Sequence, residues 1–147
     1  MTGMAASPEP LAQIVVVDDN PADVFLIEEA LRENQISCKI TRFEDGEQAV
    51  RALCNGGIER GEVAMPDLIL LDLNMPRSEG LEVLKQIRQN KRLAKVPVAI
   101  LTSSVSPRDR ADAESEGAAR FVAKPTDLDA FLRTVGAAAK ELLGLAR

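Results

Sequence analysis

The chain has 147 residues, a formal net charge of −5 and 46% apolar residues, which is enough to bury one core in a single domain of ordinary size. The acidic balance, with no strongly basic region, argues against a nucleic-acid-binding surface, which needs clustered Lys and Arg. The complete absence of histidine excludes a His general base and a Ser-His-Asp triad. Together with only two cysteines, far apart in the chain, it also argues against a zinc site.

The beginning of the chain predicts neither a signal peptide nor a membrane anchor. Residues 1–10 contain no basic residue and no apolar stretch, and no apolar run approaches the roughly 20 residues that span a bilayer. We therefore expect a cytoplasmic protein with a flexible N-terminal arm over residues 1–10. Cys38 and Cys54 are expected to be reduced thiols, although the sequence leaves a disulfide between them open.

Five short apolar segments have the character of strands in a parallel sheet. The first, Ile14–Val17, is continuously apolar, as is typical of a strand that is buried on both faces. It is followed directly by Asp18 and Asp19, and the third segment ends in the same way at Asp72. The sequence predicts strands at residues 14–17, 38–43, 67–72, 96–101 and 121–124.

Segments with helical spacing of apolar residues alternate with these strands. The first helix is expected to begin at Asn20, with Pro21 in its first turn and Asp23 as an N-terminal acid. The fourth, starting at Ser106, has no large apolar residue and should pack weakly near the surface. Thr126 is the expected cap of a long last helix with an apolar stripe. Five strand–helix alternations predict an α/β fold, a parallel sheet with helices on both faces.

In such a sheet the ligand site lies beyond the carboxyl ends of the strands. Asp18 and Asp19 follow the first strand, Asp72 the third, Thr102 the fourth and Lys124 the fifth. Three neighbouring carboxylates repel one another unless a cation neutralises them, and oxygen-only donors favour a hard ion such as Mg²⁺. A carboxylate is also a competent nucleophile toward phosphorus. The set therefore indicates magnesium-assisted phosphoryl chemistry.

Each of these residues also has an ordinary interpretation when it is taken alone. An acid pair before a helix is usually a solvated turn, a strand-end Thr such as Thr102 is usually a satisfied core-edge residue, and Lys124 alone would be a surface charge. Their joint occurrence at successive strand ends is what favours a functional site.

With these residues the chain resembles the receiver domains of two-component response regulators, over about residues 11–135. The resemblance implies a flavodoxin-like (βα)5 fold with strand order 2-1-3-4-5. We expect one receiver domain over residues 11–147 with an extended C-terminal helix and no output domain, because only twelve residues follow Val135 and they have the pattern of a continued helix. The matching segments are Val17-Asp18-Asp19-Asn20, Leu70-Leu71-Asp72-Leu73-Asn74-Met75-Pro76, Gly80, Leu101-Thr102-Ser103, Gly117-Ala118 and Lys124-Pro125.

The resemblance also implies a role for each site residue. Asp72 would accept a phosphoryl group from a sensor histidine kinase. Mg²⁺ would be bound directly by Asp19, Asp72 and the backbone carbonyl of Asn74, while Asp18 would act mostly through water. Thr102 would move to meet the phosphoryl group. The protein would not be an enzyme in the ordinary sense, because it would catalyse only its own phosphorylation and dephosphorylation.

Four further positions around the site carry expectations from the family. Lys124 would pair with the phosphate, and its bond to Pro125 is typically cis in receivers, which sequence alone cannot show. Phe121 occupies the position of the switch aromatic, where a missing hydroxyl leaves packing as the driving force for rotation. Ser103 is small and would leave the site open to small donors and water.

Within the family, the chain looks similar to stand-alone regulators that partner bacterial phytochrome kinases. The similar segments are the loop 55–66, the sequence 19–23 and the sequence 72–77. The apolar residues Leu142, Leu143 and Leu145 predict a homodimer through the fourth helix, fifth strand and last helix. The alternative is that these residues fold onto their own domain. No nucleic-acid or membrane partner is expected.

Three other functions are alternatives to a receiver. A magnesium-dependent phosphatase of the haloacid-dehalogenase type needs a second acid two residues after its nucleophile, where this chain has Asn74, and it needs a cap domain. A P-loop or flavin-binding domain needs phosphate-binding glycines, but the chain has no GxxxxGK[ST] motif. A pseudo-receiver that serves only as a scaffold is the remaining alternative, and the complete set of site residues argues against it.

Overall fold

The computed structural model of the chain describes residues 11–75, 78–103 and 106–144. Five parallel strands form its central sheet, and their order is β2-β1-β3-β6-β7. This is the order 2-1-3-4-5 that the resemblance implied, so that prediction is confirmed. The segment expected as a flexible arm, residues 1–10, lies outside the described residues. The strands are β1 (Ala12–Val17), β2 (Cys38–Phe43), β3 (Leu68–Leu71), β6 (Val98–Thr102) and β7 (Arg120–Ala123).

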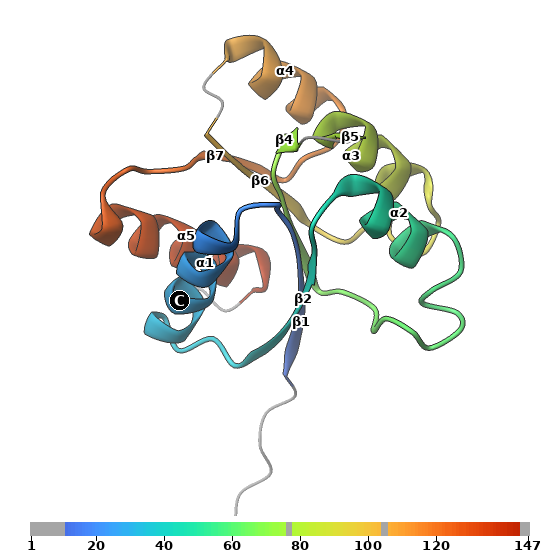
Figure 1. Cartoon of the computed structure of the whole chain (residues 1–147), viewed down its shortest axis with the longest axis horizontal. Helices are drawn as coiled ribbons and strands as arrows, with labels where there is room; N and C mark the ends of the chain where they lie inside the picture. Colours follow the sequence, from blue (N-terminus) through green and yellow to red (C-terminus); the bar gives the residue numbers. More distant parts are fainter. Residues whose placement is uncertain (1–10, 76–77, 104–105, 145–147) are drawn as a thin grey trace, which may run out of the picture.

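Helices cover both faces of the sheet, as Figure 1 shows: α1 and α5 lie on one face, and α2 and α3 lie on the other with α4 beside them. Alternate residues of β1 face the two cores. Ile14 and Val16 pack with α1 and α5, whereas Val15 and Val17 pack with α2 and α3. Both faces of β1 are therefore buried, which explains why residues 14–17 are all apolar. The helices are α1 (Pro21–Glu33), α2 (Gly46–Cys54), α3 (Gly80–Gln89), α4 (Pro107–Ser115) and α5 (Leu128–Leu142).

The expected starts of α1 and α4 are found. The Asn20 side chain accepts hydrogen bonds from the first turn of α1, and Ser106 caps α4. Among the described residues of α4, Ala113 is the one that is buried. The start of α5 differs from the prediction, because the cap is Asp127 rather than Thr126. The Asp127 carboxylate accepts a hydrogen bond from the Ala130 amide at 2.8 Å. That amide is three residues ahead, where a capping side chain finds its donor.

The segment after β3 contains secondary structure that was not predicted from the sequence. Two short antiparallel strands, β4 (Asn74–Met75) and β5 (Ser78–Glu79), lie between β3 and α3. The ladder of β3 with β1 ends at the pair Val17 and Leu71, so β3 is shorter than predicted. Asp72 consequently lies just past the last residue of β3 that pairs with β1.

The end of α5 packs on its own domain. Leu142 and Leu143 are half-buried against the core between the sheet and helices α1 and α5, whereas Leu145 lies outside the described residues. These two leucines therefore provide less free apolar surface for a dimer than the sequence suggested.

The two cysteines lie on opposite faces of the sheet. Cys38 packs against the core under α1 and α5 and Cys54 against the core under α2 and α3, and both are free thiols, so no disulfide joins them. In the described part of the chain, no helix is long and apolar enough to cross a membrane.

Arg88 joins the end of α3 to the loops on either side of it. Its guanidinium donates to the backbone carbonyls of Leu93, Ala94 and Val96, and to that of Gly117 at 3.0 Å. One side chain thus satisfies carbonyl groups from two loops far apart in the sequence.

Arg88→Ala is expected to lower the free energy of unfolding by about 1–3 kcal/mol, because it leaves part-buried carbonyls without their donor. Urea unfolding followed by circular dichroism measures this loss. Arg92→Ala is the matched control, since Arg92 forms an exposed ion pair with Glu59 that should contribute less than about 1 kcal/mol. Equal losses for the two variants would contradict the role given to Arg88.

Candidate functional site

Backbone hydrogen bonds continue beyond the ends of the strands and hold the residues that follow them. The Asp18 amide donates to the Phe43 carbonyl at 3.1 Å, and the Asp72 amide donates to that of Val17 at 3.0 Å. The Lys124 amide donates to the Thr102 carbonyl at 2.7 Å. These hydrogen bonds therefore fix the backbone of Asp18, Asp72 and Lys124, whose side chains were predicted to lie at one edge of the sheet.

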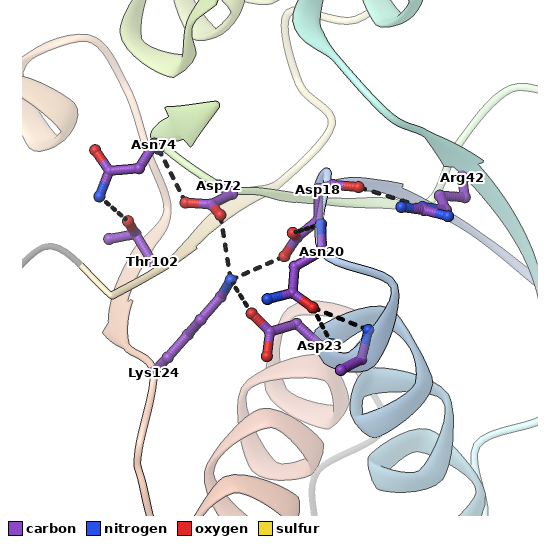
Figure 2. A network of polar contacts seen from close by, with 9 residues as sticks. Asp18, Asn20, Asp23, Arg42, Asp72, Asn74, Thr102 and Lys124 are labelled. Atoms are coloured by element: carbon purple, nitrogen blue, oxygen red, sulfur yellow. Dashed lines mark hydrogen bonds and ion pairs between the residues drawn. The ribbon is translucent and has the colours of Figure 1, made fainter. Parts of the chain in front are cut away.

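The centre of the site is the ammonium group of Lys124 (Figure 2). Its Nζ lies 2.9 Å from Asp18 Oδ2, 2.7 Å from Asp23 Oδ2 and 3.2 Å from Asp72 Oδ2. An ammonium group has three N–H donors and no acceptor, so these three carboxylates match its hydrogen-bonding capacity. A residue from the first turn of α1 and residues from just past the ends of β1, β3 and β7 are thereby brought together.

Burial makes this network electrostatically important. Asp18 is 2% exposed and Asp72 is 5% exposed. Burial raises the pKa of Asp18, against the lowering effects of the Asn20 amide and the Lys124 ammonium. Burial would lower the pKa of Lys124, but its hydrogen bonds to Asp23 and Asp18 and the charges of Asp18 and Asp72 outweigh that effect and raise the pKa. Lys124 is therefore held as a cation among the acids.

The three carboxylates singled out in the sequence form a group that fits a metal ion. Asp18, Asp19 and Asp72 each offer one oxygen, and these oxygens lie within 4.8 Å of one another. Asp19 is exposed, whereas the other two are buried. The donors are all oxygen atoms, which suits Mg²⁺ or Mn²⁺ better than a metal that prefers nitrogen or sulfur.

Asn74 and Thr102 lie on the other side of Asp72. The Asn74 amide donates to Asp72 Oδ1 at 3.0 Å, and its side-chain Nδ2 lies 3.4 Å from Thr102 Oγ1, which is fully buried. Gly80 closes this side, because a Cβ atom there would lie 2.6 Å from the Asp72 carbonyl oxygen. The beginning of α3 therefore approaches the Asp72 backbone as only glycine permits.

The remaining predicted residues surround this group. Ser103 is exposed, next to Thr102. Phe121 is half-buried against the core under α2 and α3, and the Arg110 guanidinium of α4 lies over its ring, 5.7 Å from the centroid. This contact links Phe121 to α4.

The bond between Lys124 and Pro125 corrects one expectation. Over the described ranges no peptide bond is cis, so this bond is trans. The trans isomer is the one that an X–Pro bond favours in itself. Lys124 reaches all three carboxylates with the bond in this form.

Sequence reasoning missed Asp23 as a site residue. Its position in the first turn of α1 gave it an adequate role as a helix-terminal acid, yet its carboxylate has the shortest contact with Lys124. The spacing carries a signal, because a residue four or five positions after an acid pair at a strand end lies on the first turn facing the same edge. Arg42 was also missed; its Nε donates to the Asp18 backbone carbonyl at 3.2 Å.

The arrangement provides a buried carboxylate beside a cation, a neighbouring hydroxyl and a group of oxygen donors, which are the requirements for transfer of a phosphoryl group to Asp72. Residues 14–136 match the sequence profile of the response regulator receiver domain. The chain belongs to the response regulator receiver family. Every residue of the site lies within the matched part.

Individual receivers are similar over most of the chain. Response regulator Rcp1 of Synechocystis is 38% identical over 106 residues, which are 72% of this chain and 71% of that protein. The crystal structure of the phosphorylated cyanobacterial phytochrome response regulator RcpA has a TM-score of 0.84 and 30% identity, over 94% of this chain and 98% of that one. The Mn²⁺-bound form of Rcp1 has a TM-score of 0.81 and 30% identity, over 92% and 97%.

These similarities agree with the geometry. The fold is the receiver fold, and the chain is a response regulator receiver with an acidic group of the kind at which receivers bind Mg²⁺ or Mn²⁺. Receiver domains partner with histidine kinases and are generally signalling proteins rather than enzymes.

Proposed function

We propose that this receiver is a phosphorylation switch in a two-component phosphorelay, with Asp72 as the phosphoacceptor. The observation that carries the proposal is the convergence of Asp18, Asp19 and Asp72 with the Lys124 ammonium at one edge of the sheet. A nucleophilic carboxylate, oxygen donors for a divalent cation and a fixed cation for the phosphate are thus present in one place.

The proposed transfer is a displacement at phosphorus. A carboxylate oxygen of Asp72 attacks the phosphorus of a phosphohistidine on the kinase, the P–N bond breaks, and the imidazole leaves with the electron pair of that bond. The product is an acyl phosphate on Asp72. Lys124 then pairs with a phosphoryl oxygen, and the Thr102 hydroxyl moves to meet another. Ser103, which is exposed beside Thr102, leaves the approach open to water for hydrolysis.

The residues present fit a bound magnesium ion. Asp19, Asp72 and the Asn74 carbonyl would hold it directly, and Asp18 would hold it through water. When bound, Mg²⁺ neutralises charge on the transferring phosphoryl group. Asp18 and Asp72 are buried with a single ammonium beside them, so an added cation relieves a repulsion that the fold already contains.

Phosphorylation is proposed to be read out by contact with other proteins in the cytoplasm. Thr102 and Phe121 lie on β6 and β7, and Arg110 of α4 lies over the Phe121 ring. We propose that phosphorylation of Asp72 changes the surface of α4, β7 and α5 through these residues. We place a homodimer contact on this surface. Sedimentation at high micromolar concentration should give the mass of a dimer, and a monomer throughout would contradict this contact.

The kinase is proposed to be of the phytochrome type. The similarity to Rcp1 and to the phytochrome response regulator RcpA supports this, together with the loop 55–66 and the segments 19–23 and 72–77. Transfer from a phosphorylated phytochrome-type kinase should clearly outpace transfer from unrelated histidine kinases at equal concentration. Equal rates would refute the pairing and leave the phosphorylation switch itself intact.

Acetyl phosphate and Mg²⁺ test the proposed function without a kinase. We expect the intact mass to increase by one phosphoryl group, and the gain to disappear on mild alkaline treatment because acyl phosphates are labile. The same incubation with a chelator should give no gain. A protein that takes up no phosphoryl group from acetyl phosphate or from any histidine kinase would be a pseudo-receiver instead.

A further inference from the structure

We propose that Asp23 is a positioning residue that holds the Lys124 ammonium from α1 and so keeps the carboxylates of Asp18 and Asp72 available to a divalent cation. The inference rests on the proposed function and adds to it a determinant of metal affinity. Asp23 touches neither the phosphoryl group nor the metal in this role, because it acts through Lys124.

The first observation is that Asp23 makes the shortest of the three carboxylate contacts with Lys124 Nζ. Its Oδ2 lies 2.7 Å from Nζ, against 2.9 Å for Asp18 Oδ2 and 3.2 Å for Asp72 Oδ2. The Asp23 side chain is 24% exposed, and that of Lys124 is 9% exposed, so the pair is shielded enough for its attraction to count. The ammonium is therefore held most closely by the one acid that comes from a helix.

The second observation is that the backbone beneath Asp23 is fixed. Asn20 Oδ1 accepts from the Asp23 amide at 3.2 Å, and the Asn20 amide donates to Asp18 Oδ1 at 2.9 Å. Asp18, Asn20 and Asp23 form one hydrogen-bonded corner between β1 and α1 (Figure 2). This corner presents the Asp23 carboxylate to Lys124 from a preorganised position.

The third observation is that Lys124 and the metal would compete for the same groups. Two of the three ammonium partners, Asp18 and Asp72, belong to the carboxylate group that fits a metal, whereas Asp23 is not part of it. With Asp23 present, the ammonium keeps a carboxylate partner while a cation takes the other two. Without it, every remaining carboxylate partner of Lys124 is one that the metal also needs.

Loss of Asp23 is therefore expected to weaken Mg²⁺ binding. The dissociation constant of Mg²⁺, measured by isothermal titration calorimetry, should rise about threefold to tenfold in Asp23→Ala, in the lower part of the range of coupling between residues of one ion-pair network. Glu47→Ala is the matched control, because Glu47 is an exposed acid in the first turn of α2 and its loss changes the net charge equally. This control should change the constant by less than about twofold.

A double-mutant cycle tests whether Asp23 affects Mg²⁺ binding through Lys124. In the Lys124→Met background, the further change Asp23→Ala should alter the Mg²⁺ dissociation constant by less than about twofold. An equal rise in both backgrounds would overturn the proposal, because Asp23 would then act by its charge alone. No rise in Asp23→Ala would overturn it as well.

A measurement on the ammonium itself covers the case in which Lys124→Met fails to fold. The ¹⁵N-resolved NMR signal of the Lys124 ammonium should persist when Mg²⁺ is added to the wild type, and should be lost to solvent exchange when Mg²⁺ is added to Asp23→Ala. Identical behaviour in the two proteins would refute the holding contact. A wild type that binds no Mg²⁺ would instead refute the proposed function, and the inference with it.

Discussion

Lys124→Met is expected to lower the free energy of unfolding of the metal-free protein by about 3–5 kcal/mol, the usual cost of removing one partner from a buried ion pair. The ammonium is the shared partner of Asp18, Asp23 and Asp72, and two of these are nearly inaccessible to solvent. Without it the buried carboxylates repel one another. Urea unfolding at neutral pH measures the loss, and Lys85→Met, at an exposed position of α3, serves as the control.

The loss should depend on Mg²⁺ and on pH. Saturating Mg²⁺ should stabilise the variant more than the wild type, since it supplies the missing positive charge. The pKa of Asp18 is already raised by burial, and it rises further when the lowering effect of Lys124 is removed. A group with a raised folded-state pKa stabilises the fold in its protonated form, so the deficit of the variant should shrink as the pH falls below neutral. A deficit below about 1 kcal/mol at neutral pH would contradict this view of the site.

Asp72→Asn is expected to abolish phosphoryl uptake from acetyl phosphate while the fold is retained. An amide oxygen is a far weaker nucleophile than a carboxylate, whereas the Asn side chain keeps an acceptor for the Asn74 amide. Intact-mass spectrometry over time measures the uptake, and circular dichroism checks the fold.

An aspartate next to the opposite end of β3 provides the control for this variant. Asp67 lies just before β3, is exposed, and accepts a hydrogen bond from the Gln13 amide at 2.7 Å. Asp67→Asn should take up the phosphoryl group at the wild-type rate. Uptake by Asp72→Asn at a rate comparable with Asp67→Asn would mean that another group is the acceptor.

The sequence was sufficient for the sheet and for most of the candidate site because both follow from strand ends. A short apolar strand followed by a charged residue, repeated along the chain, determines where Asp18, Asp72 and Lys124 lie once the strands are parallel. Asn20 and Ser106 were predicted correctly as caps, because a cap depends on a few neighbouring residues.

Features that depend on contacts between distant segments were not predictable. Asp23 had a sufficient local role as a helix-terminal acid, and its contact with Lys124, 101 residues away, appears only when α1 and β7 are placed together. The same holds for Arg88, which joins loops that no local pattern connects. Thr and Asp are both residues that cap helices well, so the local sequence did not distinguish Thr126 from Asp127, and the side chain that accepts from the Ala130 amide is that of Asp127.

The most direct test of the central claim is to locate the phosphoryl group after incubation with acetyl phosphate and Mg²⁺. Borohydride reduction converts a phosphorylated aspartate to homoserine, which peptide mass spectrometry then assigns to a position in the chain. We predict conversion at position 72 and at no other aspartate. Conversion at Asp18 or Asp19, or a stable phosphoryl group on a hydroxyl residue, would contradict the assignment of Asp72 as the phosphoacceptor.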